Sequence, residues 1–162
     1  NNAAVRQEAA LDQMSVEQWR TTLAVVLDGA FFCTRAALPL LRKSARASIV
    51  NIGGMTGHTG AARRAHVVTA KAGLAGLTRA LAHDLAADNI TVNCVAPGLI
   101  DTVRNTASAS AAPDHRRRHQ PLLDRHGTAD EVAQAVVWLA GPDARFVTGQ
   151  TLHVNGGAFL GG

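Results

Sequence analysis

Residues 48–76 constrain the fold of this chain more than any other stretch. They open with SIVNIG, a short apolar and β-branched run that is typical of a buried strand. Glycines follow at positions 53, 54, 57 and 60, which favours a turn over a regular element. From about residue 66, apolar side chains recur every three to four positions, as on one face of a helix. The stretch therefore predicts a strand, a glycine-rich turn and a helix, and such turns bind ligands in open α/β sheets.

Two capping boxes mark the starts of further helices. Ser15 is followed three residues later by Gln18, and Thr128 is followed by Glu131 in the same way. In this arrangement the two side chains satisfy each other's backbone N–H groups at the first turn of a helix. We therefore expect one helix to begin after Ser15 and another to begin after Thr128.

The predicted strands alternate with these helices. Residues 48–53, 90–96 and 151–155 are short and apolar, and the second of them is ended by Pro97-Gly98. Alternating strands and helices form parallel sheets with helices on both faces, because the crossover connections are right-handed. The sequence therefore predicts an α/β fold in which these three strands are parallel neighbours.

Composition places the chain among globular domains. Its 162 residues are 47% apolar and 17% charged, which is enough for one domain with a hydrophobic core. The net charge of +4 would suit nucleic acid, but aromatic residues make up only 4% and the arginines are scattered outside residues 115–119. We expect no nucleic-acid partner. We also expect no membrane, because no continuous apolar run approaches the length of a membrane span.

The two cysteines indicate a reducing environment. Cys33 falls in an apolar helical stretch and Cys94 in an apolar strand. Such positions favour buried free thiols over a disulfide or a metal site. We therefore expect no metal and a cytoplasmic protein.

Five short motifs occur along the chain in order: NNAA, VVLDGAFF, AKAGL, APGLIDT and VTGQTLHVNGG. Together they resemble the short-chain dehydrogenase/reductase family, and the resemblance covers the whole chain. It implies a Rossmann-like, doubly wound parallel sheet. Residues 1–162 would be the C-terminal part of this single domain, with the N-terminal nucleotide-binding half upstream. Residues 103–127 would be the mobile lid over the substrate.

The resemblance also predicts a degenerate active site. Members of the family use a Ser, a Tyr, a Lys and an Asn, and the Tyr exchanges a proton while hydride moves to or from nicotinamide. Lys71 stands at the position of the Lys. Gly54, Val67 and Val26 stand at the positions of the Ser, the Tyr and the Asn, and the chain contains no tyrosine. Only Lys71 would then remain of the four catalytic side chains.

A nicotinamide cofactor, NAD or NADP, is implied by the same resemblance. Lys71 would bind the nicotinamide ribose, and the alternative is a solvated helix lysine. The residues expected to contact the cofactor are Asn2, Ala3, Ile52, Gly53, Lys71, Pro97, Gly98, Ile100 and Thr102.

Several charged side chains near the turn are candidates for contact with the substrate. His58 lies in the turn and His66 adjoins Val67, and an imidazole can move a proton near neutral pH. However, His66 is turned about 100° around the helix from position 67. Arg63 and Arg64 could meet an anionic substrate. The alternative for all four is an ordinary surface position.

Two functions remain open. The resemblance implies an NAD(P)-dependent oxidoreductase that acts on a small molecule: a ketone, a secondary alcohol or an oxoacyl thioester. The absence of three catalytic side chains favours a catalytically defective member that serves in cofactor binding or assembly. Cofactor-dependent turnover by the intact protein would separate the two.

A homo-oligomer is also expected. The family packs the helix after residue 15 and the helix after residue 66 against their copies in a neighbouring subunit, as a dimer or tetramer. Small residues on the second helix, such as Gly73 and Gly76, would permit that close approach. Packing within one chain is the alternative.

Overall fold

The computed structural model describes residues 1–5, 7–102 and 119–161. Its strands are β1 (Ser48–Ile52), β2 (Thr91–Pro97), β3 (Ile100–Asp101), β4 (Gly127–Thr128) and β5 (Thr151–Val154). Its helices are α1 (Val16–Leu23), α2 (Gly29–Leu41), α3 (Thr56–Thr59), α4 (Ala65–Leu85) and α6 (Ala129–Ala140). A π-helical segment, Ala24–Asp28, joins α1 to α2, and short 3-10 helices occupy Ala86–Asp88 and Pro142–Ala144.

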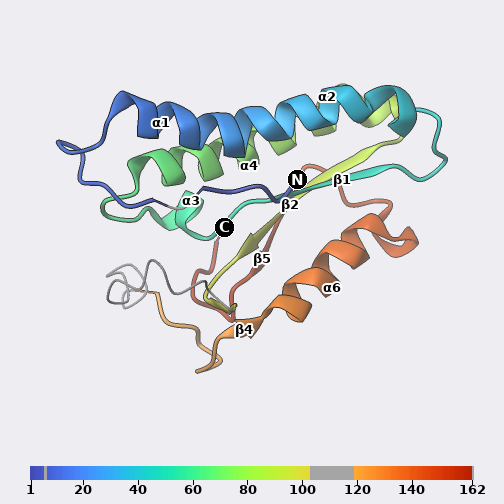
Figure 1. Cartoon of the computed structure of the whole chain (residues 1–162). Helices are drawn as coiled ribbons and strands as arrows, with labels where there is room; N and C mark the ends of the chain where they lie inside the picture. The colour runs from blue at the N-terminus through green and yellow to red at the C-terminus, as the bar shows by residue number, and fades with distance from the viewer. Residues whose placement is uncertain (6, 103–118, 162) are drawn as a thin grey trace.

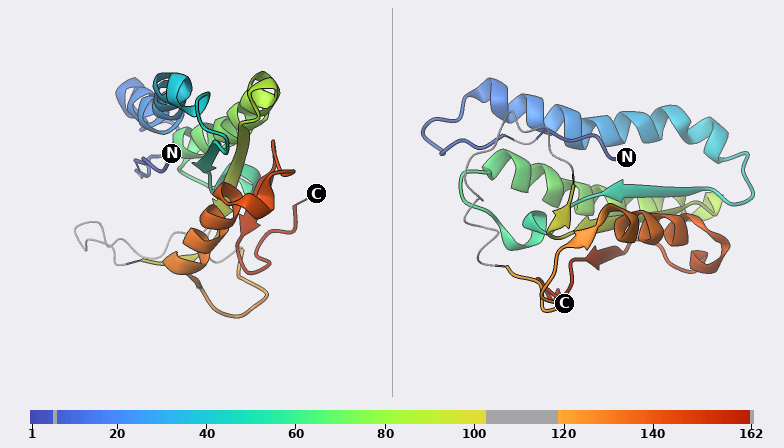
Figure 2. Two further views of the ribbon diagram at one scale, coloured as in Figure 1. Left: turned by 90° about the vertical axis from the view of Figure 1, so that its right-hand side faces the viewer. Right: turned by 60° about the horizontal axis from the view of Figure 1, so that its bottom comes forward.

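Strands β1, β2 and β5 form a parallel sheet in the order β1-β2-β5. The central strand β2 is buried at every residue before Pro97, as expected of a parallel strand that is covered on both faces. The α1–α2 run and α4 lie on one face of the sheet, and α6 lies on the other (Figures 1 and 2). The predicted α/β fold, with these three strands as parallel neighbours, is confirmed.

Helix α4 packs closely against the α1–α2 run, and the two run in the same direction (Figure 1). Val26 and Ala30 form a buried cluster with Ala70 and Leu74. A Cβ atom at Gly73 would lie 2.9 Å from Leu27 Cδ2, so this glycine permits the close approach of the two helices. Packing within one chain therefore accounts for Gly73.

The α1–α2 run also presents apolar side chains to the outside. Phe31, Phe32 and Leu40 are exposed. By length and composition alone, Val16–Leu41 is apolar enough to cross a membrane, although a single helix of this kind is weak evidence for a membrane span. The prediction that no run approaches that length was therefore wrong. This run is helical throughout, and only 17% of its most apolar window is buried.

The cysteines differ in their surroundings. Both are free; Cys94 is buried in β2, but Cys33 is exposed on α2. The prediction that both thiols are buried is wrong for Cys33, because its side of the helix faces away from the sheet. Among the residues that the structure describes, no group of three or more His, Cys, Asp or Glu side chains is arranged to hold a metal ion.

The start of the chain pairs with the edge of β1. The amino group of Asn1 donates to the carbonyl of Val50, and the carbonyl of Asn1 accepts from the N–H of Ile52, each at 2.9 Å. The Asn1 side chain also donates to Asn51 Oδ1 at 2.7 Å. This alternation is the pattern of parallel pairing, so Asn1 lies where a neighbouring strand would lie.

The predicted lid, residues 103–127, falls mostly outside the described residues. Its two flanks are held together by β3 and β4, which pair in parallel with Ile100 opposite Gly127. Whether the segment covers a substrate stays a prediction.

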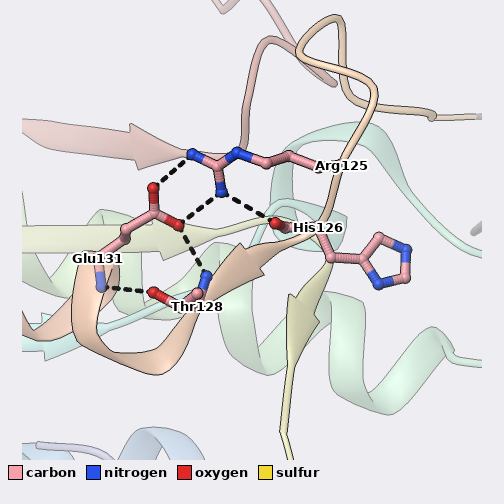
Figure 3. A network of polar contacts seen from close by, with 4 residues as sticks. All are labelled: Arg125, His126, Thr128 and Glu131. Atoms are coloured by element: carbon pink, nitrogen blue, oxygen red, sulfur yellow. Dashed lines mark hydrogen bonds and ion pairs between the residues drawn. The ribbon is translucent and has the colours of Figure 1, made fainter.

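Both predicted capping boxes are present, and the second is extended by an ion pair. Thr128 Oγ1 accepts from the N–H of Glu131, and the N–H of Thr128 donates to Glu131 Oε2. Arg125 donates to both carboxylate oxygens of Glu131, at 2.9 and 2.6 Å, and also to the carbonyl of His126 (Figure 3). The hydrogen bonds from Arg125, together with the one from the Thr128 backbone, lower the pKa of Glu131 to about 2.

We expect this network to make stability depend on acid pH. The pKa of Glu131 is lower in the folded protein than its ordinary value of 4.5, so the ionised carboxylate stabilises the fold above about pH 4.5. That contribution should disappear as the pH falls from 4.5 towards 2. Melting temperatures of the intact protein and of a Glu131→Gln variant, measured between pH 7 and pH 3, test this.

The Glu131→Gln variant should melt at a lower temperature than wild type at pH 7, and the difference between the two melting temperatures should become smaller towards pH 3. Asp130→Asn, in the same first turn of α6, is the matched control for loss of a negative charge. A gap between wild type and Glu131→Gln that stays constant over this range would contradict the assignment.

Candidate functional site

A cavity of about 160 Å³ lies at the carboxyl ends of β1 and β2, where parallel sheets bind ligands. The start of the chain, the turn after β1, one face of α4 and the turn after β2 form its walls. Of the nine residues predicted to contact a cofactor, the eight that line the cavity are Asn2, Ile52, Gly53, Lys71, Pro97, Gly98, Ile100 and Thr102. Ala3 is not among the lining residues, although Ala4 and Val5 are.

The floor of the cavity is formed where the turn after β1 continues to pair with β2. The N–H of Gly53 donates to the carbonyl of Val95 at 2.8 Å, and the N–H of Met55 donates to the carbonyl of Pro97 at 3.0 Å. A Cβ atom at Gly53 would lie only 2.7 Å from Cys94 Sγ. Glycine therefore lets the turn lie against β2. Burial raises the pKa of the Cys94 thiol, so the group beneath the turn is neutral.

Lys71 reaches the end of β1 from α4. Its ammonium group donates to the carbonyl of Ile52 at 2.7 Å. A Cβ atom at Gly57 would lie 2.9 Å from the carbonyl carbon of Lys71, so α3 packs directly on this turn of α4. Lys71 is thus half-buried in the wall of the cavity.

The three positions that the resemblance assigns to the family's Ser, Tyr and Asn fall in two different environments. Gly54 and Val67 line the cavity. A Cβ atom at Gly54 would meet no atom within 4 Å, so this position has room for a side chain. Val26 is buried in the apolar cluster between the helices, in the π-helical segment. The predicted Ser and Tyr positions therefore line the cavity, while the predicted Asn position belongs to the core.

His66 differs from the expected surface histidine. It is 0% exposed, and in the described part of the chain neither ring nitrogen has a hydrogen-bond partner. Burial, followed by the charge of Arg64, lowers the pKa of His66, so the neutral imidazole is favoured. His66 does not line the cavity, in agreement with its rotation away from Val67 around α4.

His58 also lies aside from the cavity. Its ring centroid is 4.7 Å from that of His153 and 5.9 Å from that of Phe159, and these two rings are themselves 5.1 Å apart. Burial, with the charge of Arg79, lowers the pKa of His58, and burial with His58 itself lowers that of His153. The structure therefore presents neither predicted histidine to the cavity.

Comparison with known proteins identifies the family of the chain. The family described as Enoyl-(Acyl carrier protein) reductase, a group of short-chain dehydrogenases/reductases, matches residues 1–158. The chain belongs to the short-chain dehydrogenase/reductase family.

Several curated relatives carry the name 3-oxoacyl-[acyl-carrier-protein] reductase FabG. The chain is 39% identical to the Aquifex aeolicus protein over 159 residues and 36% identical to the Vibrio cholerae protein over 163 residues. It is 34% identical to the Staphylococcus aureus protein over 160 residues. These matches cover 98–99% of this chain but only 64–65% of the relatives, so the chain spans just under two thirds of their length.

Arg64 is the cavity residue whose placement the sequence left open. It lines the cavity and forms an ion pair with Glu8, whereas Arg63 is exposed. The available signal was spacing, because positions 67 and 71 fall on one face of α4 and Arg64 is the N-cap residue just before them. In this short-chain dehydrogenase/reductase, all three residues line the cavity.

Substitution of the two glycines of the turn should have different effects on stability. Gly53→Ala would force a methyl group against the buried Cys94, and we expect it to cost about 1–3 kcal/mol of stability. Gly54→Ala, the matched control, adds the same atom where there is space and should be nearly neutral. Chemical denaturation of the intact protein measures both. Equal losses in the two variants would show that the turn does not pack against β2 in this way.

Proposed function

We propose that the intact protein binds a nicotinamide nucleotide, NAD or NADP, in this cavity and uses it to reduce or oxidise a small molecule. The observation that carries the proposal is Lys71, held 2.7 Å from the carbonyl of Ile52 in a cavity between the turns after β1 and β2. The substrate class is a ketone, a secondary alcohol or an oxoacyl thioester. The oxoacyl thioester is the first to test, because relatives are named as 3-oxoacyl reductases.

Different residues of the cavity would bind different parts of the cofactor. Lys71 would donate to the hydroxyl groups of the nicotinamide ribose. The backbone near Ile100 and the hydroxyl of Thr102 would contact the nicotinamide amide and the phosphates. The nicotinamide ring, when bound, supplies or accepts the hydride. Gly53 and Gly98 line the cavity and let its walls pack closely, because a Cβ atom at either would lie 2.7 Å from Cys94 Sγ or Asn155 Cβ.

Proton transfer would be the slow part of this chemistry. Val67 presents only methyl groups where the family has its Tyr, and Gly54 has no hydroxyl group. Carbonyl reduction must deliver a proton to the oxygen as hydride arrives, and a positioned acid typically contributes a factor of about 10²–10⁴ in rate. We therefore expect slow turnover, with water near Lys71 as the proton source.

A catalytically defective subunit is the second candidate. The missing acid at Val67 favours it, and so do the exposed apolar side chains of α2, which would suit contact with another copy. A cytoplasmic dimer or tetramer that packs through the α1–α2 run and α4 fits both candidates, because burial of that face would remove apolar surface from water.

Cofactor affinity tests the role of Lys71. We expect the intact protein to bind NADH or NADPH, and Lys71→Ala to weaken that binding by about tenfold or more, because a charged hydrogen bond is lost. Lys43→Ala removes an exposed lysine outside the cavity and should have no effect. Fluorescence titration of the reduced cofactor measures all three affinities. Unchanged affinity in Lys71→Ala would contradict the proposal.

Turnover separates the two candidates. The same preparations, given acetoacetyl thioester and reduced cofactor, should oxidise the cofactor slowly if the protein is an enzyme. Cofactor binding without any thioester-dependent oxidation would favour the second candidate.

A further inference from the structure

We propose that Arg64 binds a carboxylate group of the substrate, and that Glu8 occupies this position until the substrate arrives. The proposal rests on the proposed function, because it takes the cavity as the place where the substrate lies.

Arg64 is the N-cap residue of α4, and Lys71 lies in the second turn of that helix. They are seven positions apart, which corresponds to about 10 Å along the helix axis. Val67 lies between them, and all three side chains line the cavity. A group bound by Arg64 is therefore far from the ribose that Lys71 would hold. This separation favours a substrate group over a part of the cofactor.

The contact with Glu8 shows that the guanidinium group of Arg64 binds a carboxylate. Arg64 donates from both Nε and Nη2 to the same carboxylate oxygen of Glu8, with the Nε contact at 2.9 Å. The Arg64 side chain is only 17% exposed, but that of Glu8 is 31% exposed. The N–H of Ala9 is bonded to the carbonyl of Arg63, which anchors the adjacent backbone. The Glu8 side chain can therefore rotate away without displacement of its backbone.

The charge of the cavity favours an anionic ligand. Among its described lining residues, the charged side chains are Arg64 and Lys71, both positive, and none is acidic. Val5 and Val67 supply an apolar wall beside them. Among the substrate classes of the proposed function, a ketone that also carries a carboxylate, a small oxo acid, matches this combination. Its carboxylate would lie at Arg64 while its carbonyl lies towards Val67. Arginine stays protonated at all relevant pH values, so Arg64 would bind and orient the substrate without donating a proton.

Calorimetric titration of the intact protein with acetoacetate and with methyl acetoacetate tests the proposal. The two probes share a carbon skeleton but only the first is charged. Wild type should bind acetoacetate about tenfold more tightly than the ester, since charge-assisted hydrogen bonds are at stake. Arg64→Gln should remove this preference. Glu8→Gln should strengthen acetoacetate binding, because the competing carboxylate is gone.

Arg63→Gln is the matched control, because it removes an equal charge one residue away and outside the cavity; it should keep the preference. Arg64→Lys keeps the charge without the planar fork and should show a reduced preference. Equal affinity of wild type for acid and ester, or a preference that survives in Arg64→Gln, would overturn the proposal.

A second arm repeats the titration with saturating NADH or NADPH. Retained acetoacetate binding supports a substrate site, and competition by the cofactor would assign Arg64 to a cofactor phosphate and overturn the proposal. Failure of the proposed function would look different. Wild type would then bind neither cofactor, while the preference for acid over ester would still be measurable in the first arm.

Discussion

The hydrogen bond from the N–H of Gly53 to the carbonyl of Val95 is the contact on which the site depends. It continues the pairing of β1 with β2 beyond the last residue of β1, and the hydrogen bond from the N–H of Met55 to the carbonyl of Pro97 extends that pairing to the end of β2. The absence of a side chain at Gly53 makes it possible, because Cys94 lies directly beneath. With the turn fixed there, the carbonyl of Ile52 points to Lys71 and the helix face of α4 lies over the opening.

Local signals in the sequence were sufficient for the architecture. The β-branched run of β1, the glycines after it and the capping boxes at Ser15 and Thr128 each depend on residues close together in the chain. They combine into only one common arrangement, because crossover connections between parallel strands are right-handed. The resemblance to the family then placed Lys71 and the turn after β2 at the same edge of the sheet.

The features that sequence missed all depend on distant parts of the chain. Arg64 and Glu8 are 56 residues apart, and no local pattern joins them. The burial of His66 depends on what packs against α4, since helix period gives the direction of a side chain but not what covers it. The exposure of Cys33 was missed for a similar reason, because an apolar helix can be apolar on its outer face too.

The scaffold and the chemistry of this site can be separated experimentally. Val26 is part of the apolar core, so replacement by Asn would bury an amide and confuse stability with activity. Gly54 and Val67 face the cavity, and a side chain at position 54 has space. The double variant Gly54→Ser, Val67→Tyr therefore introduces two hydroxyl groups at positions that line the cavity and leaves Val26 in the apolar core unchanged.

The most direct test compares wild type with this double variant as intact proteins, in single-turnover oxidation of reduced cofactor by acetoacetyl thioester. If the scaffold is in place and a positioned acid is what it lacks, the double variant should react about 10²–10⁴ times faster than wild type. No increase in a double variant that still binds cofactor would contradict the account. Rapid turnover by wild type would also contradict the account if two conditions hold: the His58→Ala and His66→Ala variants retain that rate, and the double variant does not exceed it.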